Sequence, residues 1–187
     1  MATRTTPARL LERRRRILKR GVYLLDRHFL RRKQRYLAQA TLAAIALGAV
    51  LAIEDSLTNA AIVTAIASSA FIIFMTPASN MAGPRRVMGG HAVGIVIGLT
   101  GSLILHDVLG EPYGSSLVTD IGAAVGVGVS MLVMAATDTE HPPAAGTVLG
   151  LTLAPDPLSS GLLVIAAAFA LSAIRNLCRR WLIDLVH

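Results

Sequence analysis

One polar segment, Thr137–Gly146, interrupts the apolar part of the sequence and holds the residue types that could do chemistry. Charged and imidazole side chains are costly at or near a lipid bilayer, so those found there usually line a pathway or a binding site. Pro142 or Pro143 can start a new helix, because a first-turn residue needs no N–H. The polar side chains just before the prolines are then expected to surround the free N–H groups of the helix start. That position carries partial positive charge and suits a small anion.

Two residues are the first candidates for contact with such an anion. His141 can change its charge near neutral pH, because the pKa of imidazole ordinarily lies near 6.5. Arg85 is the best-placed cation, since its guanidinium fork can hold two oxygen atoms of one anion. The competing interpretations are that His141 caps the helix or bonds a backbone carbonyl, and that Arg85 only anchors the chain at the membrane surface, as Arg86 would.

The remaining polar residues have supporting roles in this hypothesis. Asp138 and Glu140 would repel an anion as bare carboxylates, so we expect them to pair with Arg85 or to couple protons. His91 would be a second donor or a structural link, and the two threonines would be hydroxyl donors or helix caps. The candidate substrate-binding residues are therefore Arg85, His91, Thr137, Thr139, His141, Pro142 and Pro143, and the pairing or proton-coupling residues are Arg86, Asp138 and Glu140.

Metal and enzyme chemistry have little support in the sequence. No His-Glu-x-x-His or Cys-x-x-Cys spacing occurs, so no zinc site is predicted. The single cysteine, Cys178, cannot form an internal disulfide. No serine or cysteine has an evident base, and no glycine-rich phosphate loop is present. We expect a protein without enzymatic activity, metal or cofactor.

Composition and charge indicate an integral membrane protein. Of the 187 residues, 53% are hydrophobic and only 16% are charged, against about 25% charged in a typical soluble domain. Most Lys and Arg residues stand before residue 36, so the net charge of +7 describes a basic tail on an apolar body. Aromatic residues make up only 4%, which argues against nucleic-acid binding. The sequence thus divides into a tail, residues 1–35, and a transmembrane domain, residues 36–187.

The tail has a pattern of its own between Ala8 and Lys33. Apolar residues recur there at helical spacing, with arginines on the other faces, and the stripe consists of Leu11, Leu18, Val22, Leu25 and Phe29. Such a helix can lie flat on a membrane that contains anionic lipid. The alternative is a solvated tail that only fixes the orientation of the protein.

The body reads as an all-α, polytopic membrane helical bundle. Five long apolar runs predict about five full spans, namely Leu37–Ile53, Leu57–Met75, Val87–Leu105, Leu117–Ala136 and Leu158–Ile174. The run Ala144–Ala154 is short: with the prolines it gives about 13 helical residues, or roughly 20 Å, against a hydrocarbon core of roughly 30 Å. It is either a re-entrant half-helix or a short span.

The loops alternate in charge. Acidic residues fall in loops without Lys or Arg, whereas both chain ends and the Gly83–Arg86 loop are basic. The positive-inside rule then predicts a multi-pass protein of the plasma (inner) membrane with both termini in the cytoplasm.

A parallel internal repeat is also indicated, with units at about residues 57–106 and 117–154. Each unit has an apolar run, a polar segment with proline and a run rich in small residues, and Pro84 corresponds to Pro142 or Pro143. The two polar segments are expected to meet inside the fold. Glycines three and four residues apart, from Gly90 to Gly101, would let a second helix approach closely and would allow self-association.

Residues 37–178 resemble the HPP family of small integral membrane proteins, named for its His-Pro-Pro tripeptide. One family motif fits at Thr137, Thr139, His141, Pro142, Pro143 and Ala144. The other fits at Pro77, Ser79, Ala82, Pro84, Arg85, Gly89, Gly90 and His91. The sequence departs from the family at Asn80, Gly83 and Arg86, where Pro, Gln and Asn are common.

Plastid members of that family are regarded as nitrite transporters. The resemblance therefore implies an integral membrane transporter or channel for a small inorganic anion, with nitrite as first candidate. The alternative is a non-transporting structural or regulatory membrane module that engages lipid or a partner through its basic tail. The sequence leaves the coupling ion, the oligomeric state and the choice between channel and carrier open.

Overall fold

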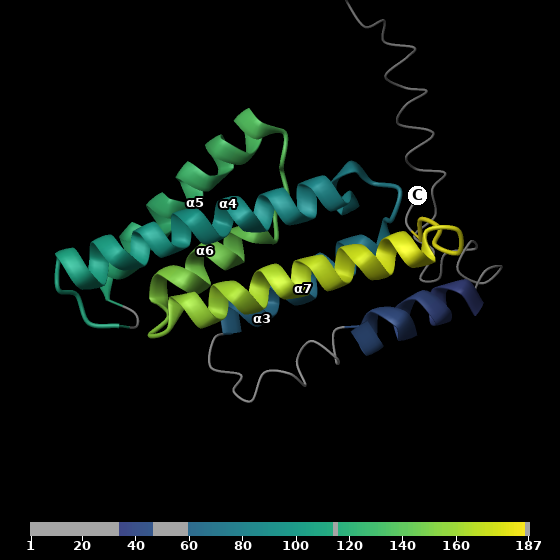
Figure 1. Cartoon of the computed structure of the whole chain (residues 1–187), viewed down its shortest axis with the longest axis horizontal. Coiled ribbons are helices and arrows are strands. Elements are labelled where there is room, and N and C mark those ends of the chain that lie inside the picture. Colours follow the sequence, from purple (N-terminus) through teal and green to yellow (C-terminus); the bar gives the residue numbers. More distant parts are fainter. Residues whose placement is uncertain (1–33, 47–59, 114–115, 186–187) are drawn as a thin grey trace, which may run out of the picture. The chain divides into compact units, whose positions relative to one another are not determined.

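The computed structural model describes residues 34–46, 60–113 and 116–185, and all regular structure in these ranges is helical (Figure 1). Residues 34–46 form a helix. The later elements are α3 (Ala60–Met75), the 3₁₀ turn η1 (Asn80–Ala82), α4 (Pro84–Ser102), the π-helical turn η2 (Leu103–Val108), α5 (Leu117–Thr137), α6 (Ala144–Leu153) and α7 (Pro157–Cys178). The predicted all-α class is confirmed.

Three of these helices are long and apolar enough to cross a membrane: Pro84–Val108, Leu117–Thr137 and Pro157–Cys178. Helices α3 and α6 are apolar but shorter, and α6 has the short length expected for the segment after the prolines. The predicted count of about five full spans goes beyond these findings, because residues 47–59 lie outside the described part. The amphipathic helix predicted at Ala8–Lys33, and with it the division at residue 35, also lies outside it.

Proline and short polar side chains fix where the helices begin. Pro84 occupies the first turn of α4, and Pro157 does the same in α7, where the Asp156 carboxylate accepts a hydrogen bond from the Ser159 N–H at 3.2 Å. Ser116 and Thr119 form a reciprocal capping box at the start of α5. After α4 the helix continues as η2 through Val108, three residues beyond the end of the predicted run Val87–Leu105.

The outer surface of the helices is apolar, which is the reverse of a soluble protein. In the most apolar stretch of α5 only 22% of the residues are buried, and the share is 33% in the helix Pro84–Val108 and in α7. Large side chains such as Leu132 on α5 and Leu162 on α7 are more than two-thirds exposed. A lipid bilayer is the environment in which such a surface is stable.

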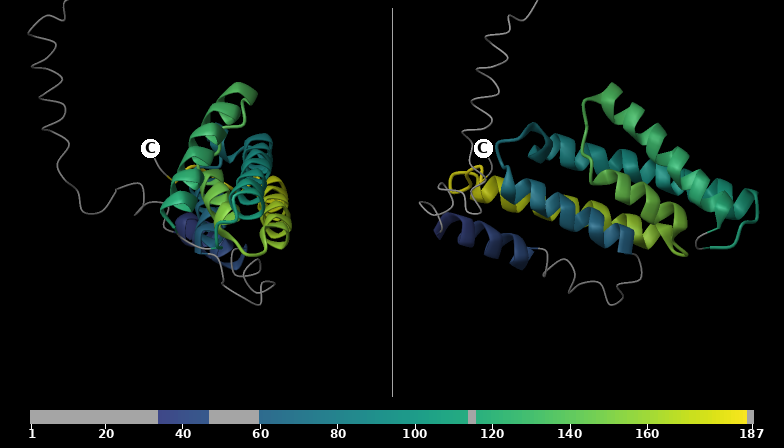
Figure 2. Two further views of the ribbon diagram at one scale, coloured as in Figure 1. Left: turned by 90° about the vertical axis from the view of Figure 1, so that its left-hand side faces the viewer. Right: turned by 180° about the vertical axis from the view of Figure 1, so that it is seen from behind.

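Helix α6 lies at the centre and contacts α3, α4, α5 and α7 (Figures 1 and 2). The α4 glycines make its closest approach possible. A Cβ atom added to Gly94 would lie 2.9 Å from the Ala144 carbonyl oxygen, and one added to Gly98 would lie 2.8 Å from the Leu151 Cβ. The glycine face of α4 is thus occupied by α6 of the same chain. Self-association stays a prediction, and the glycine face of α4 gives it no support because α6 already covers that face.

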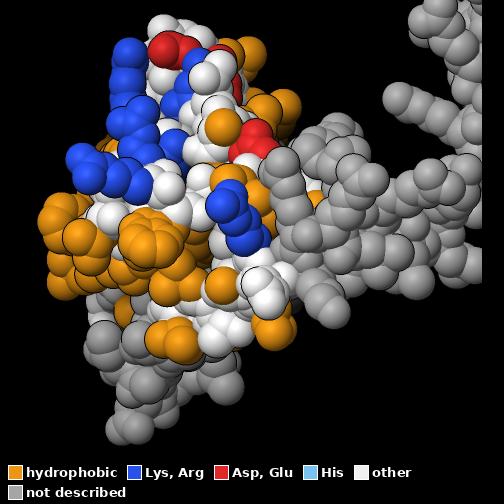
Figure 3. All heavy atoms as spheres, turned by 90° about the vertical axis from the view of Figure 1, so that its right-hand side faces the viewer, with side chains coloured by type: hydrophobic (Ala, Val, Ile, Leu, Met, Phe, Trp, Pro, Cys, Tyr) orange, Lys and Arg blue, Asp and Glu red, His pale blue; other side chains and the backbone are white. Residues whose placement is uncertain are grey.

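Basic residues gather at one end of the helical body. The Arg175 side chain donates to the Pro77 carbonyl, and Arg85 donates to the Thr137 carbonyl, so the end of α7 and the start of α4 lie at this end. Figure 3 looks onto it and shows blue Lys and Arg side chains, red acidic ones among them, above a surface of hydrophobic side chains. We call it the basic end.

Three hydrogen bonds bring the segments that contain Gln39 and Leu185 to the basic end as well. The Gln39 side-chain amide donates to the carbonyls of Phe74 and Ile183, at 2.7 and 3.0 Å. The Leu185 N–H donates to the Met75 carbonyl at 2.9 Å. At the opposite end, buried His106 bonds the carbonyls of Glu111 and Thr152. The sorting of loops by charge that the sequence shows is therefore a property of the fold.

Candidate functional site

Two buried histidines meet inside the helical body, joined by one serine hydroxyl. The Ser69 Oγ atom of α3 lies 2.8 Å from Nε2 of His91 on α4 and 2.9 Å from Nε2 of His141. His91 is 1% exposed, and His141 and Ser69 are 0% exposed. The two imidazole rings are 5.1 Å apart between centroids and nearly edge-to-face. We call Ser69, His91, His141 and their partner Thr147 the histidine bridge.

The outer nitrogen of each ring also has a partner. His91 Nδ1 lies 2.8 Å from the Thr147 hydroxyl on α6, and His141 Nδ1 lies 3.0 Å from the Met81 carbonyl oxygen of η1. A carbonyl can only accept, so His141 must donate from Nδ1. Four elements, α3, η1, α4 and α6, thus converge on two imidazoles, and each of their four ring nitrogens has a hydrogen-bond partner.

Glycines make room for this arrangement. A Cβ atom on Gly90 would stand 2.6 Å from the Cβ of His141, and one on Gly89 would strike the side chain of Thr139. These two residues of the first polar motif therefore let the His-Pro-Pro segment lie directly on α4. The predicted meeting of the two polar segments is present, since His141 bonds Met81. The internal repeat itself stays a prediction.

His141 is held as a neutral ring by its surroundings. It lies in the turn between α5 and α6, and burial lowers its pKa to about 4, although the bond to the Met81 carbonyl acts in the opposite direction. Transfer of a charge out of water is unfavourable unless a counter-charge comes with it. Burial therefore disfavours the protonated, charged form of His141.

An ion-pair cluster stands beside the bridge at the basic end. Arg86, whose side chain is 23% exposed, pairs with Asp138 and, at 3.1 Å, with Glu140. Arg85 is 72% exposed, pairs with Asp138 at 3.5 Å and donates to the Thr137 carbonyl. Asp138 ends α5 in the left-handed conformation, with φ 53°, which turns its carboxylate toward both arginines.

The structure groups the candidate residues differently from the sequence-based hypothesis. It brings His91 to His141 and Arg86 to Asp138 and Glu140, and the hydroxyls of Thr137 and Thr139 lie 2.8 Å apart. Among the described side chains, no hydrogen bond or ion pair joins Arg85 to His141. The roles of the candidate residues in substrate binding, pairing and proton coupling stay predictions.

One expectation about the His-Pro-Pro segment is wrong. The N–H groups that were to face an anion are already bonded: Ala144, Ala145 and Gly146 donate to the carbonyls of His141, Pro142 and Pro143, at 2.9 to 3.1 Å. The prolines fold residues 141–146 into a tight turn whose own carbonyls satisfy these donors. Pro142 and Pro143 thus set the turn, and the side chains carry the site's chemistry.

Ser69 and Thr147 were missed by the sequence-based hypothesis. Ser69 stands beside Ser68 in an apolar run, and nothing in the sequence separates the two. In the structure, both hydroxyls bond the carbonyl four residues back, but only Ser69 also meets the histidines. Which serine meets the histidines depends on which face of α3 packs against α4 and α6, and this packing is a feature of the tertiary structure.

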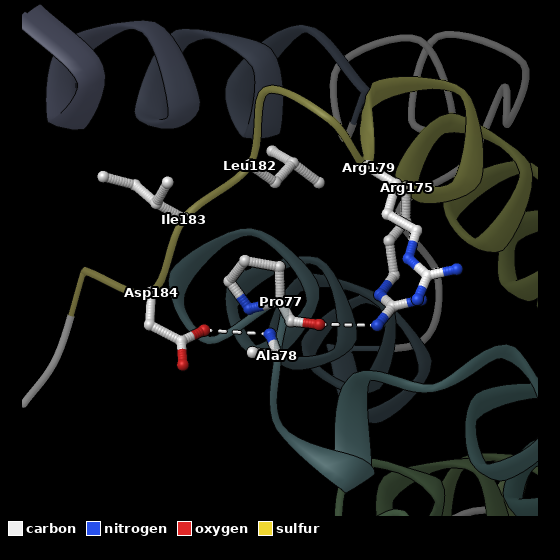
Figure 4. Close-up of a pocket in the computed structure, with 7 residues that line it drawn as sticks. All are labelled: Pro77, Ala78, Arg175, Arg179, Leu182, Ile183 and Asp184. Atoms are coloured by element: carbon white, nitrogen blue, oxygen red, sulfur yellow. Dashed lines mark hydrogen bonds between the residues drawn. The ribbon is translucent and has the colours of Figure 1, made fainter.

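A second polar feature lies at the basic end, in a pocket of about 310 Å³ lined in part by Arg175, Arg179 and Asp184. Figure 4 shows the two guanidinium groups side by side, with Arg175 bonded to the Pro77 carbonyl. The Asp184 carboxylate is turned to the Ala78 N–H, at 2.8 Å. Within the described residues, neither arginine forms a salt bridge, so both present positive charge at this end.

The fold and the buried polar centre define a helical integral membrane protein. The chain belongs to the HPP family: the family model described as "HPP, transmembrane region" matches residues 30–184. No match was found among curated proteins or among solved structures.

Proposed function

We propose that this protein moves a small inorganic anion, with nitrite as first candidate, across the plasma membrane, with both termini in the cytoplasm. Family membership and the apolar helices make it a membrane protein. The observation that carries the proposal is the histidine bridge. Buried imidazoles and hydroxyls inside a membrane-spanning body are costly to maintain, and such groups mark transport pathways.

The charges at the basic end support an anionic substrate. Arg85 and Arg86 share two carboxylates, and Arg85 is bound loosely enough to be mostly exposed. An incoming anion can replace the Asp138 carboxylate on the Arg85 guanidinium, because both present oxygens to the same fork. The arginines that line the nearby pocket, half-buried Arg175 and exposed Arg179, raise the local concentration of anions.

The test is nitrite uptake into proteoliposomes made with the purified full-length protein. We expect uptake by the parent, and background uptake by His141→Ala and Arg85→Ala at equal protein content. Arg180→Ala is the matched control, since Arg180 is exposed and outside the ion-pair cluster. Protein-free liposomes measure the background from nitrous acid.

Two results would argue against the proposal. Uptake by both variants at the parental rate would remove His141 and Arg85 from the pathway. An inactive parent, together with a cellular phenotype that is lost when residues 1–35 are deleted, would favour a membrane module that engages lipid or a partner through its tail.

A further inference from the structure

We propose that the histidine bridge holds one proton shared between His91 and His141 through Ser69, and that this proton crosses with the anion as a neutral pair. The inference rests on the proposed anion transport and adds its coupling ion. It follows from counting the hydrogens that the bridge's contacts require.

Without an added proton, one arrangement satisfies every contact between the bridge side chains. His141 donates from Nδ1 to the Met81 carbonyl, so its Nε2 has a lone pair and must accept the Ser69 hydroxyl proton. Ser69 has no second proton, so in this arrangement it does not donate to the Ala65 carbonyl, and His91 donates to Ser69 from Nε2. His91 Nδ1 then accepts from Thr147. The four bonds run in one direction, from Thr147 to Met81.

One extra proton fits the same atoms. With His141 protonated at both nitrogens, its Nε2–H donates to Ser69, which turns its hydroxyl to the Ala65 carbonyl at 2.8 Å. Ser69 then accepts from both imidazoles and donates once, which is the full capacity of a hydroxyl. The third contact of Ser69, to Ala65, is what lets the bridge take a proton without leaving a buried donor unpaired.

The proton can also pass between the rings. When the extra proton is on His91, its Nδ1 donates to Thr147 and its Nε2 donates to Ser69, whose hydroxyl still donates to His141. The His91 Nε2–H bond then breaks as an O–H bond forms on Ser69, and the original Ser69 O–H bond breaks as an N–H bond forms on His141. One proton has moved from ring to ring, and Ser69 is regenerated. The proton comes from water on one side and returns to water on the other.

The capacity is one proton, because two imidazolium rings 5.1 Å apart in a buried site repel strongly. The described elements around the bridge offer it no unpaired counter-charge. Helices α3, α6 and turn η1 contain no Asp, Glu, Lys or Arg. The charged residues closest in sequence to the two histidines, Arg85 and Arg86 on α4 and Asp138 and Glu140 before His141, are paired with one another. An anion is therefore the partner that makes the proton's entry favourable.

The first experiment reads the protons directly. ¹⁵N-histidine NMR of the full-length protein in lipid nanodiscs, assigned with His91→Asn and His141→Asn, should show hydrogen on Nδ1 of His141 and on Nε2 of His91 at neutral pH. On acidification, the two rings should titrate as a pair that takes up one proton. The opposite tautomers, or two independent titrations, would overturn the proposal.

The second experiment measures coupling. A pH-sensitive dye inside proteoliposomes should report acidification when nitrite is added under a fixed membrane potential, above the protein-free background. Ser69→Ala should lower this proton flux by about 100-fold, as expected for loss of a positioned proton-transfer group. Ser69→Thr keeps the hydroxyl and should retain flux. Ser68→Ala is the matched control, since Ser68 also bonds the carbonyl four residues back but does not touch the histidines.

The outcomes separate the two proposals. Nitrite uptake with no accompanying protons, or parental proton flux in Ser69→Ala, disproves the relay and leaves anion transport standing. No uptake of nitrite by the parent disproves nitrite transport, and the relay is then decided by the tautomers and the joint titration in the NMR experiment.

Discussion

At the scale of single residues, Ser69 decides what the two histidines can do. Alone, each buried imidazole would be a structural hydrogen-bonding group, which was the competing interpretation of His141 from the sequence. The Ser69 hydroxyl contacts both rings, so which nitrogen carries a hydrogen in one ring depends on the other ring. A residue without charge or a recognisable motif is thus the one that makes the site a candidate for proton transfer.

Stability should fall in mild acid because of His141. Burial lowers the pKa of His141 from 6.5 to about 4, so between these values the unfolded chain binds a proton that the folded protein does not. Lowering the pH through this window therefore favours unfolding, and the loss levels off below about pH 4. Melting temperatures of the purified protein between pH 7.5 and 4.5 measure it. His141→Asn should give a shallower slope, and an unchanged slope would contradict the assignment.

The histidines, arginines and carboxylates could be chosen from the sequence because they are rare in an apolar chain. Their grouping could not, since it depends on which faces of α3, α4 and α6 meet. Arg85 and Arg86 are adjacent, yet their exposed fractions are 72% and 23%. The bonded N–H groups after Pro143 were missed for a similar reason: they depend on the exact turn that two prolines make.

At the scale of elements, the His-Pro-Pro turn and the glycine face of α4 form one unit. Gly89 and Gly90 accept the polar segment, and Gly94 and Gly98 accept α6, which follows it. Proline and glycine spacing predicted both the helix start and close helix packing. The spacing did not predict that α6 is the partner helix, because small residues at helical spacing indicate a packing surface without identifying the helix that packs on it.

Gly90→Ala should disrupt this unit at the bridge. The new Cβ would stand 2.6 Å from the His141 Cβ, so α4 or His141 must shift, and overpacking of this kind costs about 1–3 kcal/mol. We expect a lower melting temperature and altered ¹⁵N shifts of His141. The control is Gly128→Ala on α5, whose Cβ meets no atom within 4 Å and which should stabilise by about 0.5–1 kcal/mol. Equal effects of the two substitutions would show that the contact at Gly90 is unimportant.

At the scale of the whole molecule, charge is distributed along the helical axes. The arginines of α4 and α7 lie at the basic end with Gln39 and Asp184, whereas His106, Glu111 and the cap Asp156 lie at the other end. Charge alternation along the sequence predicted this sorting. The histidine bridge lies one to two helical turns in from the basic end, next to the ion-pair cluster. The buried imidazoles and the charged side chains are therefore close to the same end of the helical body.

The basic end should face the cytoplasm, because loops rich in arginine are retained on that side. In a Cys178→Ser background, which removes the only cysteine, Pro155→Cys and Arg180→Cys place one thiol at each end of the body. A membrane-impermeant maleimide should label Pro155→Cys in cells with an intact plasma membrane and should label Arg180→Cys only after permeabilisation. The reverse pattern would place Arg85, Arg86 and the nearby pocket outside, so that an anion moved by the proposed transport would meet the ion-pair cluster on entry into the cell instead of on exit. The labelling result therefore tells on which side of the membrane the ion-pair cluster stands.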